Sequence, residues 1–115
     1  MKTKKIKVPI YPADIYVHLF DIDKIGEEYE VEIHPSTRAV VFNTLAPNGG
    51  LRVHVAFKEV PRLGVLAHEC VHATNSILEH SGVVADHIND ETQAYLLQWI
   101  IVEIEKFLLK YRDGN

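Results

Sequence analysis

Two histidines and a glutamate stand at the spacing of a metal site on a helix. His68, Glu69 and His72 belong to the pentapeptide His-Glu-Cys-Val-His. Residues four apart on a helix lie on one face, so both imidazoles can reach a single metal ion. Glu69 lies on the neighbouring edge of that face, where its carboxylate can act on a metal-bound water. The spacing predicts a Zn²⁺ site with His68 and His72 as ligands and Glu69 as the general base.

The surrounding sequence favours a helix over residues 61–80. Pro61 is tolerated in a first helical turn, and Gly82 is suited to ending the helix. One face of this helix is predicted to be apolar. That face comprises Leu63, Leu66, Ala67, Val71, Thr74 and Leu78. Burying three polar groups without partners would cost several kcal/mol, so we expect a metal rather than ordinary helix histidines.

A catalytic zinc usually has three protein ligands and one water, so a third ligand is needed. Glu91 is the first choice, in the first turn of a second helix predicted over residues 90–111. The connection before it is short enough for the two helices to pack antiparallel. Asp86, His87 and Asp90 remain alternatives, and His80 is too far along the first helix.

The longer three-histidine signature is excluded, because Asn75 and Leu78 stand where it requires glycine and histidine. With Glu91 followed three residues later by Ala94, the chain resembles the gluzincin branch of the zincin metallopeptidases. The order of segments also resembles small zincin-like proteins encoded by bacteriophages. The resemblance covers about residues 50–105 and implies a zinc peptidase with Glu91 as third ligand. The chain departs from classical gluzincins in having no room for their large second lobe.

The single cysteine lies inside the pentapeptide. Because adjacent helical positions diverge, we expect Cys70 to turn away from the histidines and pack in the core. A cysteine nucleophile paired with His68 or His72 is the less favoured alternative. One cysteine allows no intrachain disulfide, which fits a reducing compartment.

Length and composition predict one globular domain. The chain has 115 residues, 47% hydrophobic and 24% charged, with a net charge of −4. That charge argues against a general nucleic-acid binder. No stretch reaches the roughly 20 apolar residues of a membrane span, and Pro9, Pro12 and Asp14 interrupt any signal-peptide core. We therefore expect an intracellular protein, and the phage-protein resemblance implies a bacterial host.

The first half of the chain is predicted to form strands. Residues 6–11 and 15–20 are rich in β-forming types, and residues 21–28 form a polar connection or a short helical turn. Residues 31–33 and 39–45 are expected to pair as a hairpin. Residues 51–57 alternate as a half-buried strand after the Asn-Gly-Gly turn.

The predicted architecture is α+β, with a small, mostly antiparallel sheet packed against two helices. The second helix is expected to face the core with Ala94, Leu97, Ile101, Ile104 and Leu108. Tyr95 and Trp99 flank that stripe. Strand 51–57 is expected at a sheet edge, where an extended peptide substrate could pair with it. His54 would then face the cleft, although a plain exposed histidine is the favoured interpretation.

The favoured function is a zinc-dependent hydrolase, most simply a peptidase acting on a peptide or protein. Tyr95 is the first choice for an oxyanion donor, with His80 and His87 as alternatives. The alternative function is a non-enzymatic metal-binding or phage-related interaction protein with a structural or vestigial zinc. A third possibility, a chain that binds no metal, predicts no stoichiometric zinc. The sequence does not specify an oligomeric state.

Overall fold

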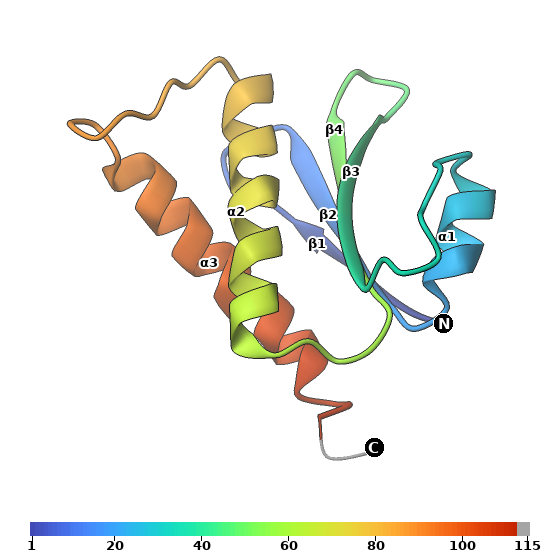
Figure 1. Ribbon diagram of the computed structural model, residues 1–115. Helices are drawn as coiled ribbons and strands as arrows, with labels where there is room; N and C mark the ends of the chain where they lie inside the picture. The colour runs from blue at the N-terminus through green and yellow to red at the C-terminus, as the bar shows by residue number, and fades with distance from the viewer. Residues whose placement is uncertain (113–115) are drawn as a thin grey trace.

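The computed structural model describes residues 1–112 and shows a four-stranded sheet with helices on both faces (Figure 1). The elements in chain order are β1 (Lys2–Lys7), β2 (Ala13–Leu19), α1 (Ile22–Glu28), β3 (Ala39–Leu45), β4 (Leu51–Phe57), α2 (Leu63–His80) and α3 (Glu91–Leu108). The sheet order is β1-β2-β4-β3. The outer pairs are antiparallel, whereas the central pair, β2 and β4, is parallel. The α+β class is confirmed, but the expectation of two helices omitted α1.

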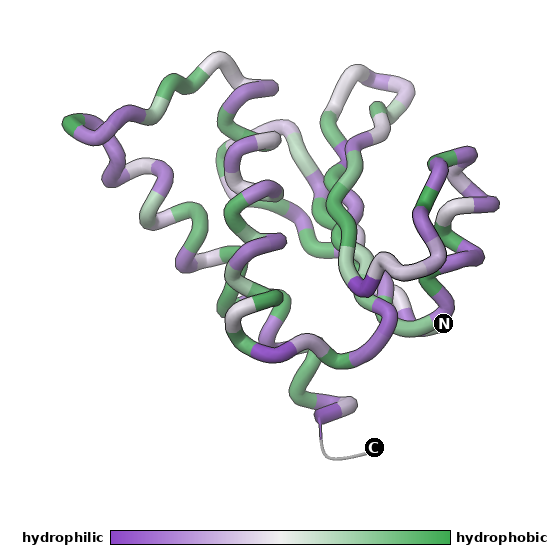
Figure 2. Tube along the Cα trace, viewed as in Figure 1, coloured by the Kyte–Doolittle hydropathy of each residue, from purple (hydrophilic) through white to green (hydrophobic). Residues whose placement is uncertain are grey.

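The main core lies between the sheet and the two long helices. Alternate strand residues point to this face, as the pleat requires, and Ile15, Val17 and Val55 are fully buried there. The long helices contribute their own buried stripes, and Figure 2 shows hydrophobic (green) stretches alternating with hydrophilic (purple) ones along α2 and α3. These stripes consist of Leu66, Cys70, Ala73 and Ile77 from α2, and Leu96, Ile100, Ile104, Phe107 and Leu108 from α3.

The helical stripes differ from the predicted ones by about one position. Ala94 is exposed, and Leu97 and Ile101 are only half-buried, because α3 turns Leu96 and Ile100 toward the sheet. On α2, Leu63 is 72% exposed. The periodic apolar pattern therefore identified both helices and part of each packing face, since five of the predicted positions are buried: Leu66, Thr74, Leu78, Ile104 and Leu108.

A smaller core covers the opposite face of the sheet. The short helix α1 buries Ile22 and Ile25 against Ala56, and Tyr29 and Phe42 pack around them. Residues 31–33 form no strand, so the predicted hairpin between them and residues 39–45 is wrong. Strand β3 instead pairs with β4.

The turn between β3 and β4 explains that pairing. Ala46 and Gly50 close it through a 2.8 Å backbone hydrogen bond, and Gly49 has a φ of 87°. Glycine adopts this left-handed conformation without the steric cost of a Cβ. The Asn-Gly-Gly sequence thus directs the chain back along the strand that precedes it.

Two further expectations about the sheet are wrong. The first strand is Lys2–Lys7 rather than residues 6–11, because the chain turns at Pro9 and Ile10. Strand β4 is central rather than an edge, since it pairs with β2 on one side and β3 on the other. Strand β3 is therefore the edge that runs beside α2.

Candidate metal site

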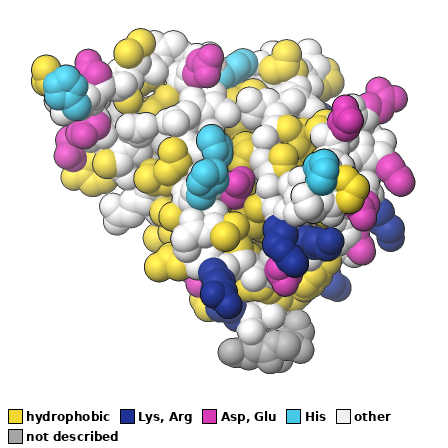
Figure 3. All heavy atoms as spheres, in the orientation of Figure 1, with side chains coloured by type: hydrophobic (Ala, Val, Ile, Leu, Met, Phe, Trp, Pro, Cys, Tyr) yellow, Lys and Arg dark blue, Asp and Glu magenta, His cyan; other side chains and the backbone are white. Residues whose placement is uncertain are grey.

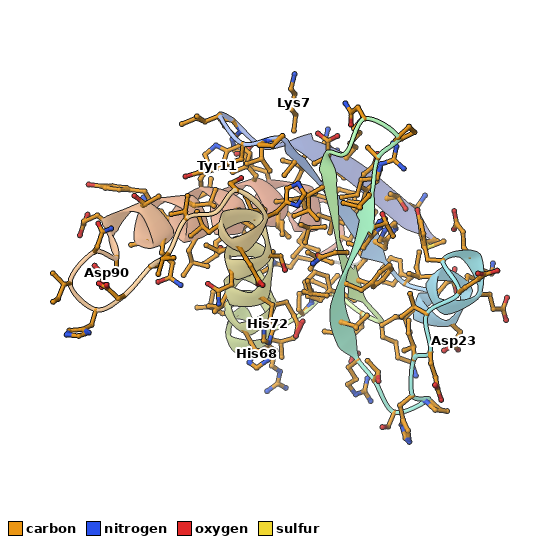
Figure 4. The ribbon with its side chains drawn as sticks, turned by 90° about the horizontal axis from the view of Figure 1, so that it is seen from above. Lys7, Tyr11, Asp23, His68, His72 and Asp90 are labelled. Atoms are coloured by element: carbon orange, nitrogen blue, oxygen red, sulfur yellow. The ribbon has the colours of Figure 1, made fainter. Side chains whose placement is uncertain are left out.

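The pentapeptide lies on α2, with its histidines pointing away from the core. Positions 66, 70, 73 and 77 pack against the sheet, so His68 and His72 fall on the outer side of the helix. Figure 3 shows adjacent histidine side chains on this exposed side with an acidic side chain beside them. In Figure 4, His68 and His72 project from α2 in the same direction.

The two imidazoles meet at their Nε2 atoms, which lie within hydrogen-bond distance of each other. Their Nε2 atoms lie 3.2 Å apart, and the ring planes cross at 73°. Two imidazole nitrogens bound to a tetrahedral zinc, each at about 2.0–2.1 Å, would lie about 3.3–3.4 Å apart. The separation and the crossed rings therefore fit two ligands of one zinc ion.

Glu69 occupies the boundary between core and solvent. Its side chain is 10% exposed, and its Oε1 lies 3.8 Å from Nε2 of His68. The neighbouring residue Cys70 is fully buried, as expected for a packing residue. Burial raises the pKa of Cys70 to about 12, and the nearby Glu69 carboxylate adds to the effect. Such a thiol is a poor nucleophile, which disfavours the cysteine alternative.

A cleft of about 470 Å³ separates α2 from β3, and Glu69 and His72 both line it. The rest of the lining comes from Ala39, Val40, Val41 and Asn43 on β3 and from Asn75, Ser76 and Glu79 on α2. Asn43 Nδ2 donates to Ser76 Oγ at 3.3 Å, which ties the strand to the helix. An edge strand thus forms one wall of the cleft that holds the candidate base.

The structure does not bring a third metal ligand to the histidines. Across residues 1–112, no three His, Cys, Asp or Glu side chains form a group that could hold a metal. Glu91 is exposed at the first position of α3. Figure 4 shows the preceding residue, Asp90, well away from His68 and His72.

The start of α3 is nevertheless tied to α2. Gln93 Nε2 donates to Asn75 Oδ1 at 2.7 Å, one helical turn beyond His72. Glu91 lies two residues before this contact. The remaining ligand alternatives, Asp86, His87 and Asp90, are exposed on the connection before α3, and His80 is exposed at the last position of α2.

The proposed oxyanion donor lies elsewhere. Tyr95 is 68% exposed and lines a separate hollow with Tyr11 and Trp99. It contributes nothing to the lining of the cleft beside Glu69. The structure therefore brings together His68, Glu69 and His72, but neither Glu91 nor Tyr95.

A second histidine pair was missed. His54 is 1% exposed rather than on the surface, and its Nδ1 lies 3.0 Å from Nε2 of the buried His18. The chain continues to Thr3 Oγ1, 3.3 Å from His18 Nδ1, and to Thr44 Oγ1, 2.8 Å from His54 Nε2. Each strand contributes one member. Here the ring planes are within 9° of parallel and every ring nitrogen has a partner, which indicates a hydrogen-bonded pair rather than a metal site.

Burial is the main cause of the lowered pKa values of these two histidines. It lowers the pKa of His18 to about 4. Burial also lowers the pKa of His54 to about 4, with smaller contributions from His18 and Arg52. Alternation in residues 51–57 placed His54 on the side opposite the valines, but no sequence signal showed that α1 and Tyr29 cover that side.

Comparisons with protein-family models, curated proteins and solved structures found no match. Within the described residues, none of the helices combines the length and the hydropathy needed to span a bilayer.

Proposed function

We propose that this chain is a zinc-dependent hydrolase that cleaves peptide bonds, similar in its chemistry to gluzincins. The observation that carries the proposal is the convergent His68–His72 pair, with the Glu69 carboxylate next to it at the wall of a cleft. His68 and His72 would supply two of the three protein ligands that a catalytic zinc needs. A zinc ion, when bound, supplies Lewis-acid activation of water and of the scissile carbonyl.

Glu69 is suited to moving the proton. Its carboxylate is close to His68 and reaches the cleft that His72 also lines. We propose that the Glu69 carboxylate accepts a proton from the attacking water and then donates that proton to the leaving amine. Because Glu69 is largely buried, bulk water has little access to its carboxylate and takes little part in this proton transfer.

Strand β3 is suited to holding a substrate. It pairs on one side with β4, and its other side borders the cleft. An extended peptide could continue the sheet there through backbone hydrogen bonds, largely independent of its sequence. We therefore propose β3 as the strand that pairs with substrate, in place of residues 51–57, which form the central strand β4.

We propose Glu91 as the third zinc ligand. The support is the Gln93–Asn75 contact, which keeps the first turn of α3 next to α2, together with the absence of ion pairs to Glu91 in the described part of the chain. Residues 86–92 are all exposed, so few packing contacts hold this segment in place. Tyr95 does not line the cleft beside Glu69, so no contact in the structure supports it as the oxyanion donor.

The deciding experiment replaces the base and leaves the histidines intact. Glu69→Gln should keep one zinc per chain and lose at least about a hundredfold in cleavage of a peptide library, since general-base catalysis contributes on this scale. Glu79→Gln is the matched control, because Glu79 lines the same cleft. It should leave turnover largely unchanged. Full activity of Glu69→Gln would remove Glu69 from the mechanism.

The second candidate is a non-enzymatic metal-binding interaction protein. It is favoured by one observation, that the described residues gather two rather than three ligands. In that case purified protein would bind zinc but cleave no peptide in the library. An intracellular location suits either function, because the single buried cysteine requires no oxidising compartment.

A further inference from the structure

Exposed apolar side chains gather where the β1–β2 turn meets the start of α3. Ile10 is 97% exposed and Tyr95 68% exposed. They line a hollow of about 230 Å³ together with Pro9, Tyr11 and Trp99. We refer to these five residues as the Ile10 patch. The patch shares no residue with the cleft beside Glu69.

The conformation of Ile10 sets this patch apart from ordinary surface. Tyr11 donates its backbone N–H to the carbonyl of Pro9 at 2.8 Å, and Ile10 between them has a φ of 72°. This is a γ-turn of the rare, strained kind, and a β-branched residue is particularly unfavourable in it. The strain holds an apolar side chain out in solvent, where folding gains nothing from it. Strained residues of this type cluster at binding sites.

Opposite charges flank the patch. On one side, Lys5, Lys7 and Asp14 line a hollow that also includes Tyr11, and because Asp14 is paired with Lys5, Lys7 gives this side its net positive charge. On the other side, Asp90 directly precedes the helix that carries Tyr95. Figure 4 shows Lys7 and Asp90 on different sides of Tyr11. Neither Lys7 nor Asp90 forms an ion pair within residues 1–112.

This pattern is complementary to itself. A two-fold axis perpendicular to the patch places the basic side of one copy against the acidic side of the other. The apolar centres then cover each other, and both charge contacts occur twice. We propose that the Ile10 patch is the interface of a symmetric homodimer, in which Lys7 of each copy faces Asp90 of the other.

The first test is sedimentation equilibrium of the full chain. The wild type should show a reversible monomer–dimer equilibrium with a Kd in the micromolar range, as a small interface allows, and the Kd should rise with salt. Ile10→Asn should weaken the dimer at least about tenfold, because it removes the central apolar anchor. The same change should not lower monomer stability, since asparagine tolerates positive φ better than isoleucine. A wild type that stays monomeric at about 500 μM would overturn the proposal.

The second test is a charge swap. Lys7→Glu and Asp90→Lys should each weaken the dimer about tenfold, because each replaces two attractions with two repulsions. The double variant should return to within about threefold of the wild type. Lys2→Glu, on the same strand, is the matched control and should have little effect. Two single variants without effect, or a double variant weaker than both, would contradict the proposed pairing.

Discussion

The buried His18–His54 pair predicts a specific loss of stability in acid. Both side chains are at most 3% exposed, and each pKa lies at about 4 rather than 6.5. The unfolded chain therefore binds more protons than the folded chain between about pH 6.5 and pH 4. The free energy of unfolding is retained in full above this window and falls as the pH drops through it.

The hydrogen-bond chain limits the size of this effect. With one proton added, every ring N–H still has an acceptor, because Thr3 and Thr44 can both accept. A second proton would leave N–H groups on both His18 Nε2 and His54 Nδ1, which face each other, and would place two positive charges side by side. Charged groups near this face include Arg52, Lys5, Asp14 and Glu28, and Asp14 is paired with Lys5. For one histidine, lowering the pKa from 6.5 to about 4 reduces the free energy of unfolding by about 3 kcal/mol at pH 4.

Urea denaturation at about pH 7 and pH 4 measures the loss. The His18→Gln/His54→Gln variant should lose about 3 kcal/mol less than the wild type on acidification, whereas His87→Gln, an exposed control, should lose as much as the wild type. Histidine NMR signals of the wild type should show both buried rings neutral at about pH 5.5. Equal losses for wild type and double variant, or a ring that titrates near 6.5, would refute the reasoning.

Two further predictions concern backbone space and thiol reactivity. Gly26→Ala should destabilise the protein by about 1–3 kcal/mol, because the new Cβ would lie 2.9 Å from the Val31 carbonyl oxygen. Gly64→Ala meets nothing within 4 Å and should stabilise α2 by up to about 1 kcal/mol. Thermal melts that rank the two variants in the opposite order would contradict this. Cys70 should resist a thiol reagent in the native protein and react in urea, since it is fully buried; rapid native labelling would show that α2 does not pack as described.

Local sequence patterns predicted the helices and strands better than they predicted which strands pair with each other. Apolar periodicity identified α2 and α3, and the Asn-Gly-Gly turn identified the β3–β4 connection once its flanking strands were known. The pairing of residues 31–33 was wrong because β-branched composition shows that a segment can be a strand, not whether a partner strand lies beside it. The central position of β4 depends on its parallel contact with β2, about 38 residues earlier in the register.

The candidate site was predictable where it depends on one helix. The four-residue spacing is sufficient to place His68 and His72 on one face with Glu69 beside it. Glu91 and Tyr95 depend on how α3 lies against α2, which the length of a connection does not determine. His54 depends on α1, whose Ile22 and Ile25 turn the second face of the sheet into a core. Where a role requires two elements, sequence reasoning misplaced His54, and the roles of Glu91 and Tyr95 stay predictions.

The most direct test of the zinc proposal is calorimetric titration of zinc into chelator-treated protein. The wild type should bind one zinc per chain, and His68→Ala and His72→Ala should each lose at least about a hundredfold in affinity, because each removes one of few ligands. His80→Ala is the control, since it removes an exposed histidine from the same helix. It should bind zinc like the wild type. Undiminished binding in His72→Ala, or no binding by the wild type, would contradict a metal site at this pair.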